Sequence, residues 1–359
     1  MKIGILGGGQ LGFMTILRGT YMGFEFNVLD KSFDVSSRKT SAKLFKFENY
    51  SEFYNESDII TFEFEHIPID IAEFMKEKLR PSLEILLLKQ NRFNEKQFLL
   101  DNKFPVPKFF KAENGREAFE IIKKNNFIPC VVKTTRLGYD GKGQFYIRSF
   151  ENLEEIYNLN EELIIEEYID FEMEVSTIVA RNELDIKVYP ISQNFHKDGI
   201  LIYNITPAKI PKKLENKIYE IAIELSKSLN LIGIVAIEFF VKDEDILINE
   251  IAPRPHNSGH WTLDGSITSQ FEQFLRAILN LPLGETTLIK PTLMINLLGV
   301  DKPNLNEIFK IKNSYFYWYF KEKKTRRKMG HINILLDEYD DYKDIVKLIL
   351  DLSNKYSVK

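Results

Sequence analysis

The stretch VAIEFFVKDEDILINEIAPRPHNSGHW limits the fold more than any other part of the chain. Two apolar runs, 235–241 and 245–251, flank an acidic turn, a pattern typical of an antiparallel β-hairpin. Glu238 and Glu250 fall symmetrically about Glu244, so they are predicted to face each other on one side of the pair. The apolar flanks of both strands indicate a half-buried sheet: Val235, Ile237, Phe239, Ile246, Ile248 and Ile251.

Two carboxylates held opposite each other repel, by about 0.2–1 kcal/mol on a sheet surface and by more where water is excluded. A divalent cation removes that repulsion, and Mg²⁺ takes one or two protein carboxylates together with nucleotide phosphates and water. Glu238 and Glu250 are therefore candidate Mg²⁺ ligands. The alternative is that both carboxylates are solvated on an exposed strand face.

The remaining segments indicate two kinds of fold. The N-terminal part alternates strands at 2–6, 24–30 and 59–64 with helices, one of them at about 69–79, as in an α/β domain. The later strands lie close together with short turns, which favours antiparallel pairing in an α+β domain. These strands are predicted at 130–135, 144–148, 162–169, 173–181 and 186–193, ahead of the hairpin. After Pro282, a segment spaced by proline and glycine leads to a small C-terminal unit.

A glycine-rich loop follows the first strand. Gly7, Gly9 and Gly12 match the pattern G-x-G-x-x-G, and Asp30 ends the next strand, as in dinucleotide-binding sites. The physical requirement is more general, because amides at a helix N-terminus favour any anion, so any phosphorylated ligand would satisfy it. A tight turn that binds nothing is the remaining interpretation.

A second glycine-rich loop, Arg136 to Gln144, lies between two predicted strands. Its three glycines and two cations predict a flap whose amides can close over a triphosphate. Lys133, on the strand just before the loop, would reach the phosphates as a point charge. An ordinary glycine-bearing hairpin explains the same pattern.

Two further segments are rich in polar side chains. Residues 254–261 (RPHNSGHW) combine dense donors and acceptors with proline and glycine, which suits a binding loop. In the C-terminal unit, Lys321 follows an aromatic run and precedes Arg326, Arg327 and Lys328. This basic cluster is either a solvated face or a clamp for a phosphate or carboxylate.

Composition argues against several classes of protein. The 359 residues carry a net charge of −4, which does not suit a general nucleic-acid-binding protein. No apolar run approaches the ~18 residues that span a bilayer, and no basic-then-apolar stretch stands before the first strand, so a leader is not expected. The single cysteine, Cys130, argues against a disulfide framework or a cysteine-based zinc site and suits a small buried hydrophobe. We expect a cytoplasmic protein that binds neither nucleic acid nor a membrane.

Five motifs along the chain occur in the order found in a known family of enzymes. They are GGGQLG (7–12), TFEFEH (61–66), LGYDGKGQ (137–144), INEIAPRPHNSGHWT (248–262) and RKMGH (327–331). Together they closely resemble the 5-(carboxyamino)imidazole ribonucleotide synthases, bicarbonate-using ATP-grasp ligases of purine synthesis. The resemblance covers essentially the whole chain, and APRPHNSGH is its most specific part.

The resemblance implies a fold of the α/β and α+β classes in three parts. These are an N-terminal Rossmann-like (pre-ATP-grasp) domain at 1–91, an ATP-grasp domain at 92–285, and a small C-terminal domain at 286–359 that completes the substrate site. The implied reaction carboxylates aminoimidazole ribonucleotide with bicarbonate through carboxyphosphate, with ATP and Mg²⁺ as cofactors. A homodimer is also implied.

The same resemblance assigns the site residues. Mg²⁺ would be held by Glu238 and Glu250, in agreement with the hairpin argument. The residues implied to bind ATP are Arg92, Lys133, Gly138, Tyr139, Asp140, Gly141, Lys142, Gly143, Gln144, Glu166, Glu167, Tyr168, Ile169, Glu174, His196, Asn249 and Glu250. Those implied to bind the ribonucleotide are Gln10, Leu11, Glu63, Asp140, Arg254, His256, Asn257, Ser258, Lys321, Arg327 and Lys328. Catalytic roles are implied for Asp140, Lys133, Arg254, Lys321 and Arg327, with Asp140 a candidate to orient or deprotonate the amine.

Three positions depart from the family pattern. Phe13 stands where arginine is common, Leu137 where glycine is frequent, and Arg326 where glycine is usual. None of them removes an implied metal or phosphate ligand, but Phe13 leaves one basic group fewer on the substrate side.

Rival hypotheses remain at this stage. A sister ATP-grasp enzyme, such as the formate-using glycinamide ribonucleotide transformylase, would share the ATP site but differ around 254–261 and 318–331. An NAD-dependent oxidoreductase would depend only on the first glycine loop and Asp30. A non-catalytic nucleotide sensor would not require the acidic pair or the basic cluster.

Nucleotide binding distinguishes the first two classes. ATP with Mg²⁺ is predicted to raise the melting temperature, because a ligand that binds only the folded state stabilises it by about 2.7 kcal/mol at a hundred-fold excess over Kd. NAD(H) is expected to leave the melting temperature unchanged. Differential scanning fluorimetry with each nucleotide measures both effects, and a shift with NAD(H) but none with ATP would contradict the ATP-grasp interpretation.

Overall fold

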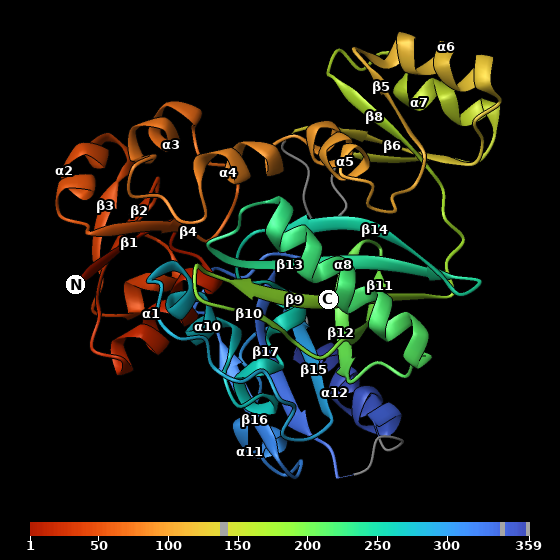
Figure 1. Cartoon of the computed structure of the whole chain (residues 1–359). Coiled ribbons are helices and arrows are strands. Elements are labelled where there is room, and N and C mark those ends of the chain that lie inside the picture. Colours follow the sequence, from red (N-terminus) through yellow and green to blue (C-terminus); the bar gives the residue numbers. More distant parts are fainter. Residues whose placement is uncertain (137–142, 338–341, 357–359) are drawn as a thin grey trace.

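The computed structural model describes residues 1–136, 143–337 and 342–356, and its strands form three sheets (Figure 1). The first sheet is parallel, in the order β3-β2-β1-β4, and helices connect its strands. Its elements are β1 (Lys2–Leu6), α1 (Gln10–Tyr21), β2 (Glu25–Asp30), η1 (Ser36–Lys39), β3 (Lys43–Lys46), η2 (Phe47–Asn49), α2 (Tyr50–Asn55), β4 (Ile59–Phe62), α3 (Ile69–Met75) and α4 (Leu83–Lys89).

The predicted α/β character of this part is confirmed, with one difference in a helix boundary. The helix expected at 69–79 ends at Met75. Beyond it, Leu79 forms a parallel bridge to Ile60, whose amide and carbonyl bond to Lys78 and Arg80. Pairing with β4 therefore pulls the last residues of the expected helix into an extended conformation.

The second sheet is small and antiparallel, in the order β5-β8-β6-β7. The helix α5 (Arg92–Asp101) leads into it, and its other elements are β5 (Phe109–Ala112), α6 (Gly115–Asn125), β6 (Cys130–Thr134), β7 (Gln144–Ile147), η3 (Phe150–Leu153), α7 (Glu154–Tyr157) and β8 (Leu163–Glu167). Helices α6 and α7 cover one face of this sheet and close a core with it. Cys130 is a free, buried thiol in that core, as its apolar surroundings in the sequence predict.

The third sheet has nine strands, with β14-β13-β9-β11-β12-β15-β17-β16 in order and β10 paired to β9. Its strands are β9 (Met173–Arg181), β10 (Ile186–Val188), β11 (Ser192–Lys197), β12 (Ile200–Thr206), β13 (Gly233–Lys242), β14 (Asp245–Ala252), β15 (Thr292–Leu298), β16 (Ser314–Trp318) and β17 (Lys328–Leu335). Its helices are α8 (Lys212–Ser228), η4 (Asn257–Gly259), α9 (Thr262–Gly265), α10 (Gln270–Ile278), α11 (Leu305–Ile308) and α12 (Tyr342–Tyr356).

The strand predicted at 186–193 is divided in the structure. Residues 186–188 and 192–197 pair with different parts of β9 as two strands. Pro190 lies between them, and proline has no N–H to continue a ladder. The prediction of a single strand is therefore wrong at this position.

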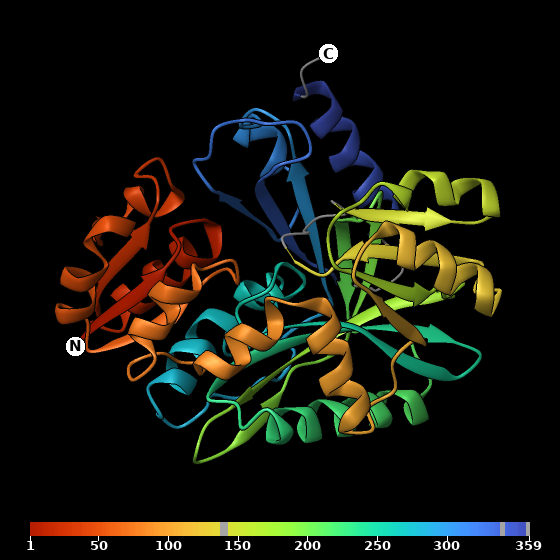
Figure 2. The ribbon, with the colours of Figure 1, turned by 90° about the horizontal axis from the view of Figure 1, so that it is seen from above.

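The large sheet joins the middle and C-terminal parts of the chain. Strand β12 pairs with β15, so β15, β17 and β16 extend the sheet that begins at β14. Figure 2 shows the N-terminal unit at the left of the molecule and the small second sheet at the right. The domain boundaries expected at 91/92 and 285/286 stay predictions, because the sheet itself continues across the second of them.

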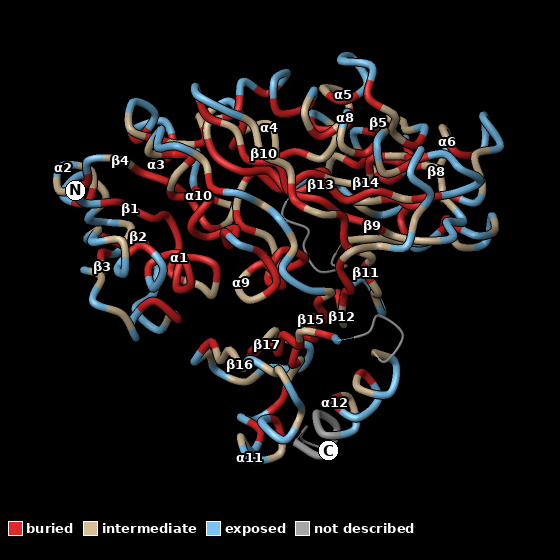
Figure 3. The backbone as a smooth tube through the Cα atoms, turned by 60° about the horizontal axis from the view of Figure 1, so that its bottom comes forward, coloured by how far each residue is buried: buried red, intermediate tan, exposed pale blue. Residues whose placement is uncertain are grey.

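Buried apolar side chains connect the units. Ile3, Ile5 and Ile16 of the first unit share one core with Phe274 and Leu275 of α10. A second core lies between α8 and the strands β9, β13 and β14, along which Figure 3 shows a concentration of buried backbone. Within the described residues, no helix has both the length and the apolar character needed to cross a membrane.

The turn of the β13–β14 hairpin generates a stability prediction. Asp243 and Glu244 both have positive φ, at 49° and 64°, a conformation for which Asn-Gly is preferred in two-residue hairpins. Replacing this pair by Asn-Gly is expected to raise the free energy of unfolding by about 0.5–1 kcal/mol, because the strain at two non-glycine residues is relieved. Urea unfolding measures the change.

The substitution also removes the exposed ion pair between Lys213 and Glu244, which are 3.3 Å apart. Lys213→Ala is the control, since an exposed pair of this kind contributes little. If the Asn-Gly variant is less stable than the wild type while Lys213→Ala is equally stable, the turn is not strained.

Candidate active site

A cavity of about 820 Å³ lies where side chains from all three sheets come together. The N-terminal unit contributes Gln10, Leu11 and Glu63 to its lining, and the small sheet contributes Lys133 and Glu166 among others. The large sheet and the loop after β14 supply the remaining wall. Residues that are far apart in the sequence thus line one cleft.

Glu238 and Glu250, called the acidic pair below, face each other across β13 and β14 as predicted. Simple symmetry about Glu244 is not the reason for this pairing. The ladder begins with Lys242 opposite Asp245 and continues to Phe239 opposite Ile248. An uninterrupted ladder would then place Asn249 opposite Glu238, but a β-bulge shifts the register by one residue. The bulge is what brings Glu250 opposite Glu238.

The two carboxyl groups of the acidic pair have different electrostatic surroundings. Burial and the neighbouring Glu250 raise the pKa of Glu238 to about 7. Partial burial also opposes ionisation of Glu250, but the charges of Lys89, Arg92 and Lys133 outweigh it, and its pKa falls to about 2. Lys89 Nζ lies 3.8 Å from Glu250. Two side chains of the same type therefore have very different pKa values in this cleft.

A chain of buried charges lies beside the acidic pair. Glu166 on β8 forms ion pairs with Lys133, from the adjacent strand β6, and with Lys96 of α5. Burial raises the pKa of Glu166, but both lysines outweigh this effect and lower it to about 2. Arg92, at the start of α5, donates from Nη1 to the carbonyl of Thr134 at 2.7 Å. This geometry aligns Arg92 and Lys133 along one wall of the cavity.

His196 on β11 and Glu174 on β9 interact across two neighbouring strands. The His196 Nδ1 atom lies 2.7 Å from Glu174 Oε2. Burial lowers the pKa of His196, but the hydrogen bond to Glu174 and the charge of Glu238 outweigh it, and the net shift is upward. Both side chains line the cavity.

The amides of the first glycine loop are hydrogen-bonded to carboxylates of the chain itself. Glu63 accepts hydrogen bonds from the amides of Gly9 and, at 2.8 Å, Gly12, while Asp30 accepts from Gly8 at 2.9 Å. A side chain at Gly9 would collide with Glu63. Because these are the amides that a pyrophosphate would need at the N-terminus of α1, the arrangement disfavours a dinucleotide there.

The segment after β14 is organised by internal contacts. Arg254 Nε lies 2.9 Å from Glu65 Oε1, and His256 Nδ1 lies 2.9 Å from Ser258 Oγ. Burial and the charge of Arg254 lower the pKa of His256 to about 3. Asn257 is tied to Asn296 on β15, and the buried Ser258 accepts from Asn204 on β12 through its carbonyl. Arg254, His256 and Asn257 line the cavity, whereas Ser258 lies behind them.

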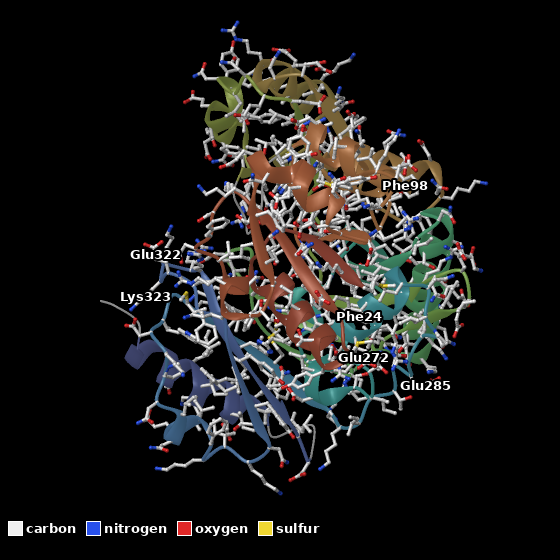
Figure 4. All side chains as sticks on the ribbon, turned by 90° about the vertical axis from the view of Figure 1, so that its left-hand side faces the viewer. Phe24, Phe98, Glu272, Glu285, Glu322 and Lys323 are labelled. Carbon is white, nitrogen blue, oxygen red and sulfur yellow. The ribbon has the colours of Figure 1, made fainter. Side chains whose placement is uncertain are left out.

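The basic cluster of the C-terminal unit is divided between the cavity and its surroundings. Lys328 lines the cavity, but Lys321 and Arg327 do not. Arg327 donates to the carbonyl of Glu322 at 2.9 Å, and Figure 4 shows Glu322 at the outer edge of this segment. Lys321 lies over the ring of Tyr319 at 5.6 Å, and its charge acts on buried Glu63. The substrate roles of Lys321 and Arg327 stay predictions.

Most of the other predicted residues are brought together. The predicted residues that line the cavity are Gln10, Leu11, Glu63, Arg92, Lys133, Gln144, Glu166, Glu167, Tyr168, Ile169, Glu174, His196, Glu238, Asn249, Glu250, Arg254, His256, Asn257 and Lys328. Gly143 helps to close the hairpin of β6 and β7 through a bond from the Thr134 amide to its carbonyl. Gly138, Tyr139, Asp140, Gly141 and Lys142 lie outside the described residues.

Sequence reasoning missed several charged residues near the acidic pair. Lys89 and Glu65 line the cavity, and Glu95 and Lys96 are buried behind it. A signal was present at the start of α5, because Arg92 and either Glu95 or Lys96 recur at the three- or four-residue spacing of one helical face, whereas Lys89 ends the preceding helix α4. Charged side chains at that spacing are usually solvated, so the pattern alone does not indicate burial.

Three family models match successive parts of the chain. The ribonucleotide synthetase preATP-grasp domain matches residues 1–89, the ATP-grasp domain matches 97–271, and the phosphoribosylaminoimidazole carboxylase C-terminal domain matches 292–344. The fold and the site thus define an ATP-grasp enzyme.

Whole-chain relatives narrow the class. The N5-carboxyaminoimidazole ribonucleotide synthase of Aquifex aeolicus is 44% identical over 342 residues, covering 93% of this chain and 92% of the relative. The Saccharolobus solfataricus protein of the same name is 40% identical, covering 98% and 95%. The N5-carboxyaminoimidazole synthase of Aspergillus clavatus, solved with ADP and 5-aminoimidazole ribonucleotide, has a TM-score of 0.90 at 26% identity, covering 99% of this chain and 98% of that one. This chain belongs to the N5-carboxyaminoimidazole ribonucleotide synthase family.

The His196–Glu174 contact predicts a pH-dependent contribution to stability. Because the pKa of His196 is raised on folding, its stabilising effect is fully present below the pKa of the unfolded state, about 6.5, and is lost as the pH rises through the folded value. His196→Gln is therefore expected to lower the free energy of unfolding by about 1 kcal/mol more at pH 6 than at pH 9. Urea unfolding at both pH values measures this difference.

Glu174→Gln provides the matched variant, since it removes the partner carboxylate and leaves the imidazole. It should abolish most of the same pH dependence. An equal cost of His196→Gln at both pH values would mean that the contact is an uncharged hydrogen bond.

Proposed function

We propose that this chain catalyses the ATP-dependent carboxylation of aminoimidazole ribonucleotide. Bicarbonate and ATP are the other substrates, and the products are 5-(carboxyamino)imidazole ribonucleotide, ADP and phosphate. Membership of the synthase family supports the reaction, and the Aspergillus clavatus relative carries ADP and 5-aminoimidazole ribonucleotide together. A homodimer in the cytoplasm remains part of the proposal by resemblance.

One observation carries the proposal. A single cavity joins Lys133, which Glu166 holds, and the acidic pair, which would bind a nucleoside triphosphate through Mg²⁺, to Gln10, Leu11 and Glu63 of the N-terminal unit. An enzyme that phosphorylates one small molecule and passes the product to another needs both substrates close together in one site. The NAD-dependent alternative loses its main support, because Glu63 and Asp30 take the loop amides.

The residues of the acidic pair fit a magnesium ion. Among the described residues, no three His, Cys, Asp or Glu side chains form a group that could hold a metal by themselves. Mg²⁺ usually takes one or two carboxylates and completes its octahedron with phosphate and water oxygens. Glu238 and Glu250 would hold it, and when bound it would neutralise charge on the phosphates of ATP.

In the first half of the proposed reaction, a bicarbonate oxygen attacks the γ-phosphorus of ATP. The bond from that phosphorus to the β,γ-bridging oxygen breaks, ADP leaves, and carboxyphosphate forms. Catalysis of such a transfer consists mainly of positioning and charge stabilisation. Lys133 and Arg92 provide positive charge along one wall, and Glu166 orients the Lys133 ammonium. Carboxyphosphate hydrolyses easily, so the site must exclude water while this intermediate exists.

In the second half, the exocyclic amine of the ribonucleotide attacks the carbon of carboxyphosphate and displaces phosphate, or it attacks CO₂ after carboxyphosphate has released phosphate. Arg254, held by Glu65, is placed to bind an anionic intermediate or product. Glu63 and Gln10 would contact the ribonucleotide from the N-terminal unit. Asp140 is proposed to orient or deprotonate the amine, as in the sequence-based prediction.

Phosphate release tests this reaction directly. The purified chain is expected to release phosphate from ATP at a high rate only when aminoimidazole ribonucleotide and bicarbonate are both present. Replacing bicarbonate by formate, and the ribonucleotide by glycinamide ribonucleotide, should give background rates. A rate that depends on formate and glycinamide ribonucleotide would show that the chain catalyses the sister reaction instead.

Glu250→Gln tests the metal assignment in the same assay. Loss of one of two metal ligands is expected to reduce turnover by at least about a hundred-fold, since metal-assisted charge stabilisation contributes several kcal/mol. Glu244→Gln is the control, because Glu244 lies in the exposed turn of the same hairpin. Near-normal turnover of Glu250→Gln would contradict the assignment of the acidic pair as metal ligands.

A further inference from the structure

Helix α5 buries two adjacent charged side chains, Glu95 and Lys96, which are only 2% and 3% exposed. The helix begins after Asn91, whose side chain accepts hydrogen bonds from the amides of Phe93 and Asn94. Burying a charge is costly unless it is paired and hydrogen-bonded. The partners that the structure gives Glu95 and Lys96 lie on other elements.

Lys96 binds the main chain of β14 at the bulge. Its Nζ atom donates to the carbonyls of Ile248, at 3.0 Å, and Asn249, at 2.5 Å. In a regular strand, successive carbonyls point to opposite edges of the strand. One ammonium reaches two successive carbonyls because the bulge turns both toward α5. Lys96 therefore recognises the irregular backbone itself.

Glu95 holds the strand on the other side of Glu250. Its Oε1 atom accepts from the amide of Ile251 at 2.9 Å, and its Oε2 atom accepts from Lys89 at 2.9 Å. The amide of Ile248 in turn donates to the carbonyl of Pro105 at 2.7 Å. The backbone is thus held before and after Glu250 by a helix and a loop that belong to neither β13 nor β14.

The register at the bulge decides which face of the hairpin carries Glu250. With a regular ladder, Asn249 would lie opposite Glu238, and the side chain of Glu250 would point to the other face. A bulge leaves one residue without a ladder partner, so it persists only where other contacts satisfy its backbone. Lys96 supplies those contacts for the carbonyls of Ile248 and Asn249.

Lys96 also connects the two sides of the cleft. It shares Glu166 with Lys133, at 3.4 Å from Glu166 Oε1. Glu166 belongs to the small sheet, whereas Asn249 belongs to the large one. The same ammonium thus ties the strand of the acidic pair to the strand pair that carries Lys133.

We propose that Lys96, assisted by Glu95, is a positioning residue that keeps Glu250 opposite Glu238 by holding the bulge at Asn249. Neither Glu95 nor Lys96 lines the cavity, so both act through the backbone of β14. The consequence for metal binding rests on the proposed function, which assigns Mg²⁺ to the acidic pair. The hold on the bulge does not depend on that assignment.

Lys96→Met, which keeps the length of the side chain but removes its donors, tests the proposal without turnover. Calorimetry gives the affinity for ADP in the presence of Mg²⁺ and in the presence of EDTA. The gain in ADP affinity that Mg²⁺ provides is expected to fall about ten-fold or more, with a much smaller change in EDTA. Hydrogen exchange of the 245–252 backbone, measured by mass spectrometry without nucleotide, is expected to become faster.

Lys111→Met is the matched control, because Lys111 is on β5 and pairs with Glu113 and Glu162 instead of β14. It should change neither the exchange of 245–252 nor the Mg²⁺-dependent gain. Lys96→Gln keeps one amide donor and is expected to give intermediate values, so it carries the test if Lys96→Met does not fold.

Two results would overturn the proposal. The first is unchanged exchange of 245–252 in Lys96→Met, which would show that the bulge does not need Lys96. The second is an equal loss of ADP affinity with Mg²⁺ and with EDTA, which would indicate a general structural role. If wild-type protein binds ADP equally well under both conditions, the metal assignment fails instead, and the exchange measurement alone decides the role of Lys96.

Discussion

Opposing carboxylates are unfavourable in a folded protein unless something nearby compensates for their repulsion, and the cleft of this chain is built around such a pair. Glu238 and Glu250 lie opposite each other because β14 bulges at Asn249. The surrounding cations act unequally, so Lys89 and Arg92 favour ionisation of Glu250 while burial opposes that of Glu238. The position of α5, the pairing of Glu166 with two lysines and the register of the hairpin all depend on one another through this arrangement.

The N-terminal unit shows how a familiar loop can serve a different purpose. Its sheet is parallel, and its first turn has the glycine spacing of a dinucleotide-binding site. The amides of that turn are nevertheless bonded to Glu63 and Asp30. A side chain at position 9 would displace the Glu63 carboxylate from the loop amides, because the two would otherwise collide. The loop therefore orients an acid at the edge of the cavity, where Gln10 and Leu11 also lie.

Continuity of the large sheet explains how distant segments reach one cavity. The hairpin of the acidic pair lies at one edge of this sheet, and the C-terminal strands extend the other. Hydrogen bonds between Asn257 and Asn296, and between Asn204 and Ser258, attach the loop after β14 to strands β15 and β12. A displacement of the C-terminal strands would therefore also move His256 and Arg254, which line the cavity. The site depends on the whole sheet as well as on its lining residues.

Much of this protein could be predicted from the sequence because the informative patterns are local. Alternating apolar residues predicted both strands of the hairpin, and the motif order from GGGQLG to RKMGH predicted the family and the fold class. The split at Pro190 and the end of α3 at Met75 were missed, because pairing with β9 and β4 decides them. Local propensity carries no information about such partners.

The tertiary structure decided what local patterns could not show. Symmetry about Glu244 predicted the right pairing of Glu238 with Glu250. The turn is nevertheless centred between Asp243 and Glu244, which by itself would pair Glu238 with Asn249. The bulge shifts the register by one residue and so brings Glu250 opposite Glu238. Glu95 and Lys96 look in the sequence like an ordinary exposed part of a helix. Their burial depends on β14 and β8, which are about 70 to 155 residues away in the chain. A buried charge is tolerated only where the fold brings its partners to it, and for that reason the sequence alone determined the family and the acidic pair, whereas the packed structure determined how that pair is held.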